Sequence, residues 1–224
     1  MSTRTKFAEL APVELSTGSG PTLYGELSVP DGATGLVLFA HGSGSSRHSP
    51  RNQFVAHVLR DAGVGTLLFD LLTTEEEEAD QYTSHIRFDL GLLAERLLQA
   101  TEWAQSRADL QQLRLGYFGS STGGGAALLA AAEQGDTVGA VVSRGGRPDL
   151  AGESLRHVVT PTLLIVGELD EPVVRLNEEA YDWMACEKEL VIVPGATHLF
   201  EEPGALDHVA RLAAHWFQEH LQPL

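Results

Sequence analysis

Short apolar runs alternate with amphipathic stretches along most of this chain. Six runs are rich in Leu, Val, Ile and Phe, which is typical of strands buried on both faces of a parallel sheet. They lie at residues 36–40, 66–70, 115–119, 139–143, 162–167 and 189–193. The stretches between them repeat apolar residues at helical spacing, so the pattern predicts β–α units with right-handed crossovers and helices on both faces of the sheet.

The same patterns set the expected helices and the domain organisation. Helices are predicted at residues 52–62, 85–106, 122–134, 172–185 and 204–221. Segments 7–15 and 22–30 are expected to form an antiparallel hairpin at the sheet edge. The sequence shows neither an internal repeat nor a linker-like composition. We therefore predict that residues 1–224 form one α/β domain of about seven or eight strands, with connections too short to hold a cap domain.

Charge and composition narrow the class of protein. The chain has 31 acidic and 15 basic residues, for a formal net charge of −16, which repels nucleic acid phosphates and anionic membranes. No apolar run approaches the roughly 20 residues of a membrane span. The N-terminal stretch does not resemble a secretory signal, and the single Cys186 cannot form an intrachain disulfide. We expect a cytoplasmic protein without nucleic-acid or membrane partners, in which the acidic run Glu75–Glu78 is a solvated loop or helix start.

A glycine-rich stretch, GYFGSSTGGG at residues 116–125, spans the end of the third of these strands and the start of a predicted helix. It contains GxSxG centred on Ser121, and this motif positions a nucleophile when it lies on a strand–turn–helix. The glycines at positions 119 and 123 would leave room for a strained backbone across a tight turn. Walker and dinucleotide-binding glycine patterns are both absent from this stretch. Ser121 is therefore the candidate nucleophile.

A serine nucleophile needs a base and a carboxylate that orients the base. Residues 168–171 follow one later strand and include three acids, of which Asp170 is our choice, with Glu168 and Glu171 as alternatives. His198 follows the last strand, in the loop PGATHLFEEPG. Carboxyl ends of parallel strands meet at one edge of the sheet, so these residues are expected to come together there.

The negative charge of a tetrahedral intermediate needs two backbone N–H donors. One is expected from Thr122, the residue after the nucleophile. The other is expected from the loop HGSGSSRHSPRN after the first of these strands, with Ser43 as our choice and Gly44 as the alternative.

Arginines also gather in loops at this edge. Arg47, His48 and Arg51 follow the first strand, whereas Arg144 and Arg147 follow the fourth. Each group either contacts an anionic or hydroxyl part of a substrate or braces its loop, and together they predict a rim that attracts anions. The candidate substrate-binding residues are Gly42, Gly44, Arg47 and Arg144.

The nine histidines show no HxxxH or HExxH spacing, and His208, His215 and His220 are expected to lie on the surface of the last helix. The sequence therefore predicts neither a metal site nor a cofactor. Cys186 is expected to be structural.

Together the segments HGSGSS, GYFGSSTGGG, VGELDEPV and PGATHLFEEPG resemble those of the α/β-hydrolase superfamily, with the triad in the order Ser121, Asp170, His198. The resemblance runs from about residue 23 to 220 and is greatest to the small, lidless dienelactone-hydrolase-like group. It implies a three-layer α/β-hydrolase fold. It also implies that relatives occur fused to or beside a phosphoribosyltransferase domain.

Dienelactone hydrolases proper carry a cysteine nucleophile, and the serine here favours a carboxylesterase that acts on small esters with short acyl chains. Lactone or thioester hydrolysis, amide hydrolysis and perhydrolysis use the same groups and stay open. A non-catalytic protein of this fold that binds a small molecule is the alternative from another class, although it would not need a complete triad. Homodimerisation also stays open.

Overall fold

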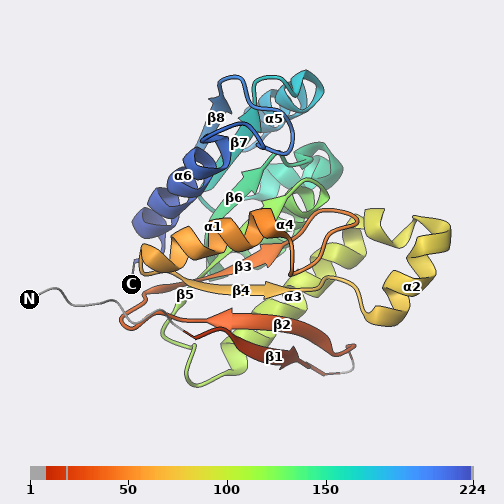
Figure 1. Cartoon of the computed structure of the whole chain (residues 1–224), viewed down its shortest axis with the longest axis vertical. Helices are drawn as coiled ribbons and strands as arrows, with labels where there is room; N and C mark the ends of the chain where they lie inside the picture. Colours follow the sequence, from red (N-terminus) through yellow and green to blue (C-terminus); the bar gives the residue numbers. More distant parts are fainter. Residues whose placement is uncertain (1–8, 19, 223–224) are drawn as a thin grey trace, which may run out of the picture.

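A computed structural model of the protein describes residues 9–18 and 20–222. Its centre is an eight-stranded sheet in the order β1-β2-β4-β3-β5-β6-β7-β8 (Figure 1). The strands are β1 (Ala11–Leu15), β2 (Leu23–Ser28), β3 (Gly35–Ala40), β4 (Gly65–Phe69), β5 (Arg114–Ser120), β6 (Val138–Arg144), β7 (Thr162–Gly167) and β8 (Lys188–Val193). From β4 to β8 all neighbouring strands run parallel, whereas β1–β2 and β2–β4 are antiparallel.

Helices cover both faces of the sheet. They are α1 (Pro50–Asp61), α2 (Thr74–Thr83), α3 (Leu90–Ser106), α4 (Thr122–Gln134), α5 (Glu171–Trp183) and α6 (Ala205–His220), with 3-10 turns at Ile86–Phe88, Gly135–Thr137 and Pro148–His157. Helices α1 and α6 pack together in front of the sheet in Figure 1, and α3 and α4 lie behind it. The expected three-layer α/β-hydrolase fold is confirmed, and no separate cap domain lies among the described residues.

Successive side chains of β3 enter two separate cores, because side chains alternate between the faces of a strand. Leu36 and Leu38 join the core under α3 and α4. Val37 and Phe39 join the core under α1 and α6, where Phe39 contacts Phe118 of β5 with ring centroids 4.9 Å apart. Burial on both faces explains why this strand is a continuous apolar run.

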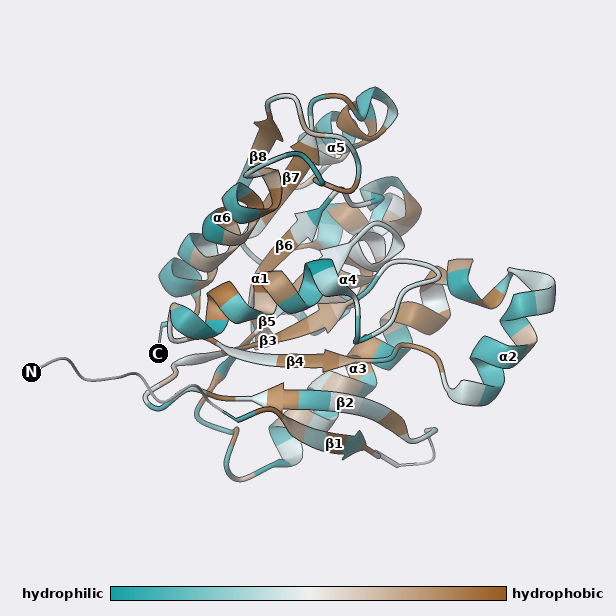
Figure 2. Cartoon of the chain, in the orientation of Figure 1, coloured by the Kyte–Doolittle hydropathy of each residue, from teal (hydrophilic) through white to brown (hydrophobic). Residues whose placement is uncertain are grey.

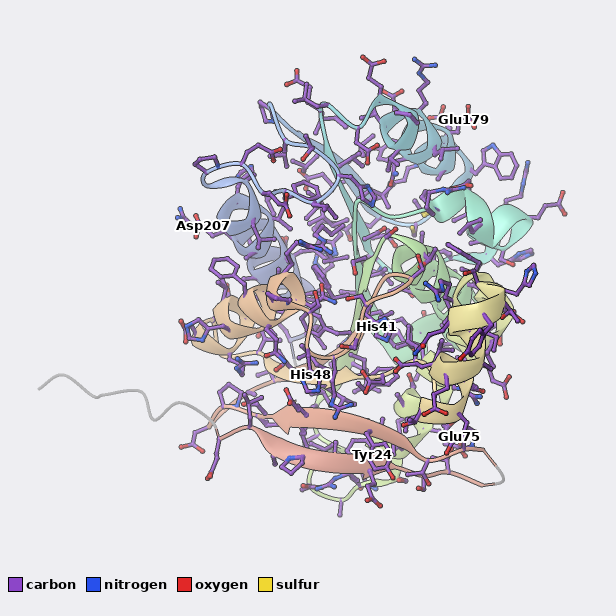
Figure 3. The ribbon with its side chains drawn as sticks, turned by 45° about the vertical axis from the view of Figure 1, so that its right-hand side comes forward. Tyr24, His41, His48, Glu75, Glu179 and Asp207 are labelled. Carbon is purple, nitrogen blue, oxygen red and sulfur yellow. The ribbon has the colours of Figure 1, made fainter. Side chains whose placement is uncertain are left out.

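Hydropathy follows this layering. Figure 2 shows hydrophobic colour along the central strands, whereas hydrophilic colour covers the outward helix surfaces and much of α2. The labelled acids Glu75, Glu179 and Asp207 lie at the outline of the molecule in Figure 3, and His41 lies toward its middle. These three acids belong to α2, α5 and α6, so helix surfaces carry part of the acidic excess.

The predicted strands agree with the structure to within a residue or two, and the predicted hairpin is β1–β2, although residues 7 and 8 lie outside the described residues. The helix predicted over 85–106 is wrong at its start. Residues 86–88 form a 3-10 turn, and α3 begins at Leu90 because the Asp89 side chain caps it by accepting from the N–H of Leu92.

The acidic run Glu75–Glu78 lies in the first turns of α2, which confirms the helix start, one of the two predicted alternatives. Thr73 and Glu76 form a capping box at the start of this helix. Arg96 of α3 forms an ion pair with Glu76, N···O 2.6 Å, which joins α2 to the rest of the protein.

Candidate active site

Ser121 lies between β5 and α4, at the carboxyl edge of the parallel sheet. Its backbone has φ 53° and ψ −122°, a conformation that residues other than glycine rarely adopt. Ser121 occupies the N-cap position of α4, yet its side chain makes no capping hydrogen bond. The hydroxyl is therefore not used to cap the helix, which distinguishes this serine from an ordinary cap.

The glycines around Ser121 are required by close contacts. A Cβ on Gly119 would lie 2.3 Å from the carbonyl oxygen of Gly123, and a Cβ on Gly123 would lie 2.2 Å from that of Ala40. Both distances are far below normal contact, so α4 can approach the ends of β5 and β3 only because these side chains are absent. The glycines hold a tight elbow, as the motif predicts.

The predicted base and acid are in contact. His198 Nδ1 lies 2.5 Å from Asp170 Oδ2, and the carboxylate side chain is only 14% exposed. Asp170 follows β7 at the N-cap position of α5, but its side chain makes no capping hydrogen bond, and its carboxylate is directed to the histidine instead. This contact selects Asp170 over the two alternative acids.

Those neighbouring acids have other partners. Glu168 accepts from the N–H of Gly195 at 2.7 Å and so braces the loop that carries His198. Glu171 is exposed and lies 3.6 Å from Arg175 within α5.

Ser121 and His198 line the same small cavity, of about 240 Å³. Its other lining residues come from the loop after β3, the start of α1, the end of β5, the end of β6 and the histidine loop: Gly42, Ser43, Ser45, Ser49, Arg51, Ser120, Arg144 and Leu199. Gly145 lies beside the imidazole, since a Cβ on it would be 3.5 Å from His198 Cε1 and Nδ1. The structure therefore brings all three predicted triad residues to one end of the sheet.

The predicted oxyanion donors lie next to each other. Thr122 is the first residue of α4, where N–H groups have no partner within the helix. The N–H of Ser43, however, donates to Oγ1 of Thr122 at 2.9 Å. An oxyanion could use the Ser43 N–H only after the threonine hydroxyl turns away, which the sequence did not predict. Gly42 and Gly44 lie in the same loop, Gly42 lining the cavity of Ser121.

His41 fixes the start of this loop. Its Nδ1 donates to the carbonyl of Gly42 at 3.0 Å, and its Nε2 accepts from the N–H of Leu71, also at 3.0 Å. These bonds require the neutral ring, and burial lowers the pKa of His41 although the bond to Gly42 opposes the shift. The loop after β3 is thereby tied to the end of β4.

Two of the arginines at this edge are braces. Arg47 forms an ion pair with Asp70, whose Oδ1 also accepts from the N–H of Arg47 at 2.8 Å. Arg147 makes two hydrogen bonds to Asp149, at 2.8 and 2.7 Å. Arg47 does not line the cavity of Ser121, so its predicted role in substrate binding is replaced by that of holding the loop.

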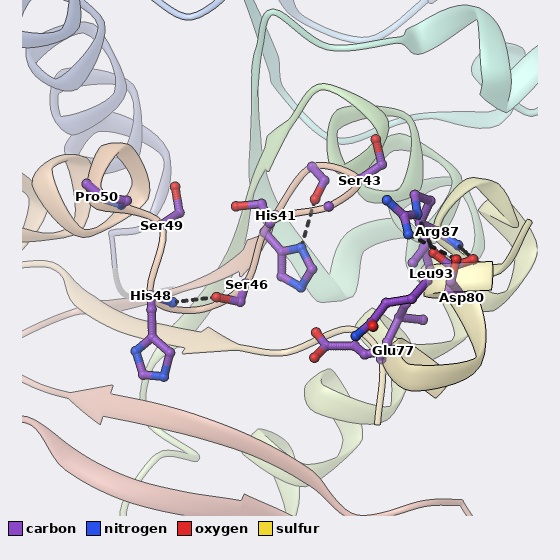
Figure 4. Close-up of a pocket in the computed structure, with 15 residues that line it drawn as sticks. His41, Ser43, Ser46, His48, Ser49, Pro50, Glu77, Asp80, Arg87 and Leu93 are labelled. Atoms are coloured by element: carbon purple, nitrogen blue, oxygen red, sulfur yellow. Dashed lines mark hydrogen bonds and ion pairs between the residues drawn. The ribbon is translucent and has the colours of Figure 1, made fainter. Parts of the chain in front are cut away.

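A larger hollow of about 530 Å³ adjoins the first. The two share Gly42, Ser43, Ser45 and Ser49. Its other wall, from α2 and the turn after it, includes Glu77, Asp80 and Arg87 (Figure 4). The sequence did not assign this segment to the site, although the capping-box spacing of Thr73 and Glu76 would have predicted a helix there.

Asp80 holds this wall together. It is almost fully buried, accepts from the N–H of Ile86 at 2.7 Å, and forms an ion pair with Arg87.

No three His, Cys, Asp or Glu side chains in residues 9–18 and 20–222 are placed to hold a metal ion. In the same part of the chain, no helix has the length and apolar character needed to span a bilayer.

Comparison with known proteins defines the family. The family model described as "Dienelactone hydrolase family" matches residues 51–222. The chain belongs to the dienelactone hydrolase family. A solved dienelactone hydrolase from Anabaena variabilis is 60% identical to it, with a TM-score of 0.94 over 96% of this chain and 99% of that one.

Two other comparisons extend this picture. A Mycobacterium tuberculosis protein named as a putative phosphoribosyl transferase is 56% identical to the present chain over 209 residues. The matched residues cover 93% of the present chain and 46% of the Mycobacterium tuberculosis protein. The chain thus spans about half the length of the curated relatives it matches. Est1E from Butyrivibrio proteoclasticus shares the fold, with 16% identity and a TM-score of 0.78 over 94% of this chain and 98% of that one.

Proposed function

We propose that this dienelactone hydrolase family member is a serine hydrolase that cleaves small carboxylic esters. The observation that carries the proposal is that His198, which is bonded to Asp170, lines one cavity with Ser121, a serine in a strained turn whose hydroxyl caps no helix. The membership itself supports the coarser statement, that of a hydrolase.

In the proposed mechanism, Ser121 attacks the ester carbonyl while His198 takes the proton from its hydroxyl. The Asp170 carboxylate holds the imidazole of His198 in the tautomer that carries its proton on Nδ1, and it stabilises the imidazolium that forms. The N–H groups of Thr122 and Ser43 bind the oxyanion, the second after the Thr122 hydroxyl releases it. His198 then protonates the leaving alcohol, and water hydrolyses the acyl-enzyme by the same steps.

The size of the cavity around Ser121 favours short acyl chains, whereas an acyl chain that entered the adjoining hollow of about 530 Å³ would have more room. The cavity around Ser121, of about 240 Å³, lies below the roughly 300–1,000 Å³ of sites that enclose drug-sized ligands. A series of p-nitrophenyl esters of increasing acyl length checks this expectation, and a preference for long chains would contradict it.

A second candidate is lactone hydrolysis. It is favoured by the relative at 60% identity whose name is dienelactone hydrolase. The same nucleophile, base and oxyanion donors would open a lactone, with the leaving oxygen kept on the acyl chain. Comparing kcat/KM for unsaturated lactones and for open-chain esters of similar leaving group separates the two candidates.

The decisive test is active-site labelling. A fluorophosphonate or sulfonyl fluoride should modify Ser121, as located by peptide mass spectrometry. Ser121→Ala should lose on the order of 10⁴-fold or more in kcat, whereas Ser120→Ala, which changes the preceding buried residue, should remain active. Labelling at another residue, or none in folded protein, would refute the proposal.

A further inference from the structure

Asn177 is a fully buried asparagine on α5, and it is held by the N–H groups of its amide. Its Nδ2 donates to the carbonyl oxygen of Gly146 at 3.0 Å and to that of Val173, one turn earlier in the same helix, at 2.8 Å. The residue is 0% exposed, and its Oδ1 is buried without a hydrogen-bond partner among the described residues. Burial of an unsatisfied amide oxygen is unfavourable. What an asparagine offers at this position is therefore its two donated bonds.

The carbonyl of Gly146 belongs to the 144–147 segment, which begins at the last residue of β6 and adjoins both the nucleophile and the base. The carbonyl of its first residue accepts from the N–H of Ser121 at 3.2 Å, and the N–H of its last residue donates to the carbonyl of Ser121 at 3.0 Å. Between them, Gly145 lies against His198, since a Cβ on it would be 3.3 Å from the carbonyl oxygen and 3.5 Å from Nδ1 of that histidine. A shift of this segment would therefore move Ser121 relative to the imidazole.

The middle of the 144–147 segment has no side chains to fix its position, because Gly145 and Gly146 are both glycines. Glycine leaves the backbone freer than other residues do, and Gly145 adopts φ 51°. The N–H of Gly145 donates to the carbonyl of Ile165 on β7 at 2.7 Å, and the carbonyl of Gly146 accepts from Asn177. The asparagine thus supplies an anchor from outside the segment.

Helix α5 also carries the candidate acid. Asp170 occupies its N-cap position and contacts His198, and Asn177 follows about two helical turns later. One helix therefore holds the acid and base at its start and the segment behind the nucleophile further along. Asn177 joins these two halves of the candidate triad.

We propose that Asn177 is a positioning residue, which sets the distance between Ser121 and His198 through its bond to Gly146. The catalytic consequence rests on the proposed function, whereas the anchoring itself can be measured without catalysis. A misplacement of about 1 Å can cost on the order of 10²-fold in rate. Loss of the anchor should thus lower kcat more than it changes KM.

Steady-state hydrolysis of 4-nitrophenyl acetate tests the catalytic consequence. Asn177→Leu replaces the amide with an apolar side chain of similar size. Its kcat should fall by roughly 10- to 100-fold, while KM changes by less than about threefold. The rate at which a fluorophosphonate labels Ser121 should fall by a similar factor, because labelling needs the same proton transfer to His198.

Gln99→Leu is the matched control. Gln99 is also buried, and its Nε2 donates to the backbone carbonyls of Leu15 at 3.3 Å and Pro21 at 2.6 Å. It joins α3 to the β1–β2 hairpin, and none of these three residues lines either cavity of the site. Both substitutions remove two bonds from a buried amide, so both should lower Tm by several degrees. Only Asn177→Leu should lower kcat.

A second variant separates the two bonds of Asn177. In Asn177→Thr the hydroxyl can still donate to the carbonyl of Val173, as helical threonines do to the carbonyl four residues earlier. The threonine side chain is shorter than the amide, so the bond to Gly146 is lost. Its kcat should fall as in Asn177→Leu, and wild-type kcat in folded Asn177→Thr would contradict the proposal.

Amide hydrogen exchange measures the anchoring without a substrate. The N–H groups of Ser121, Gly145 and Arg147 each take part in a bond made by the 144–147 segment. In Asn177→Leu these three groups should exchange at least about tenfold faster than in Gln99→Leu, because the segment opens locally. The N–H groups of the other strands should exchange at similar rates in both variants.

The outcomes separate the positioning role from the proposed function. Unchanged exchange at the three N–H groups overturns the anchor whatever the activity. A loss of kcat that Gln99→Leu shares, or no loss in Asn177→Leu, overturns the positioning role and leaves the proposed function standing. Faster exchange at these groups, in a protein whose wild type is not labelled at Ser121, supports the anchor and refutes the esterase.

Discussion

The backbone at Ser121 makes a prediction about stability that does not depend on catalysis. At φ 53° and ψ −122°, a residue with a Cβ stores roughly 1–3 kcal/mol of strain, which glycine does not. Glycine also makes the unfolded chain more flexible, which costs about 0.4–1 kcal/mol relative to alanine. The difference favours Ser121→Gly over Ser121→Ala by roughly 1 kcal/mol, or about 2–4 °C in Tm for a chain of this size.

Ser120 provides the matched control. It is the buried last residue of β5, and its φ is not positive. There, Ser120→Gly should be less stable than Ser120→Ala by about 0.5–1 kcal/mol, because glycine weakens a strand. The sign of the glycine-minus-alanine difference should therefore reverse between two neighbouring serines.

Urea unfolding of the four variants, followed by circular dichroism, measures both differences. Comparable m-values would show that the variants expose similar surface on unfolding. Both variants at position 121 lack the hydroxyl, so activity does not enter the comparison. If Ser121→Gly is less stable than Ser121→Ala by the same amount as Ser120→Gly is less stable than Ser120→Ala, the backbone at Ser121 is not strained and the argument fails.

Two further predictions concern the loop after β3. Because burial lowers the pKa of His41, the unfolded chain binds a proton at this histidine at higher pH than the folded protein does. The stability of the fold should therefore decrease as the pH drops below about 6.5, the ordinary pKa of histidine. When Tm is measured from about pH 7.5 to 5.5, His41→Gln should lose less than wild type. Thr122→Val removes the acceptor of the Ser43 N–H but keeps both backbone donors, so kcat should change by less than about tenfold, whereas a loss of 10²–10³-fold would identify the threonine hydroxyl itself as an oxyanion donor.

The sequence was sufficient to predict the layers of the fold. Strands such as β3 send side chains into cores on both faces, so burial leaves a continuous apolar run that is hard to mistake. Helix starts were less certain, because they depend on single side chains. Asp89 caps α3 and shortens the predicted helix, and the charged α2 has no apolar face wide enough to be recognised by periodicity.

For the site, order along the chain and position at strand ends were sufficient to bring Ser121, Asp170 and His198 together. The roles of the arginines were beyond sequence reasoning, because they depend on which carboxylate each one meets. Arg47 meets Asp70 and Arg144 meets none among the described residues, yet both simply follow a strand in the sequence. The bond between Ser43 and Thr122 joins residues 79 positions apart and leaves no local pattern.

The segment from Leu71 to Asp89 connects β4 to α3 and lies outside the sheet. It leaves the sheet after β4 and returns at the cap of α3, and contributes no strand. Asp80 with Arg87 organises the segment internally, and Glu76 with Arg96 attaches it to α3. Grafting a segment of different length between these two points would reshape the larger hollow without altering the elbow or the histidine loop. The fold therefore offers directed evolution one region in which libraries can be varied while the nucleophile, base and acid are kept fixed.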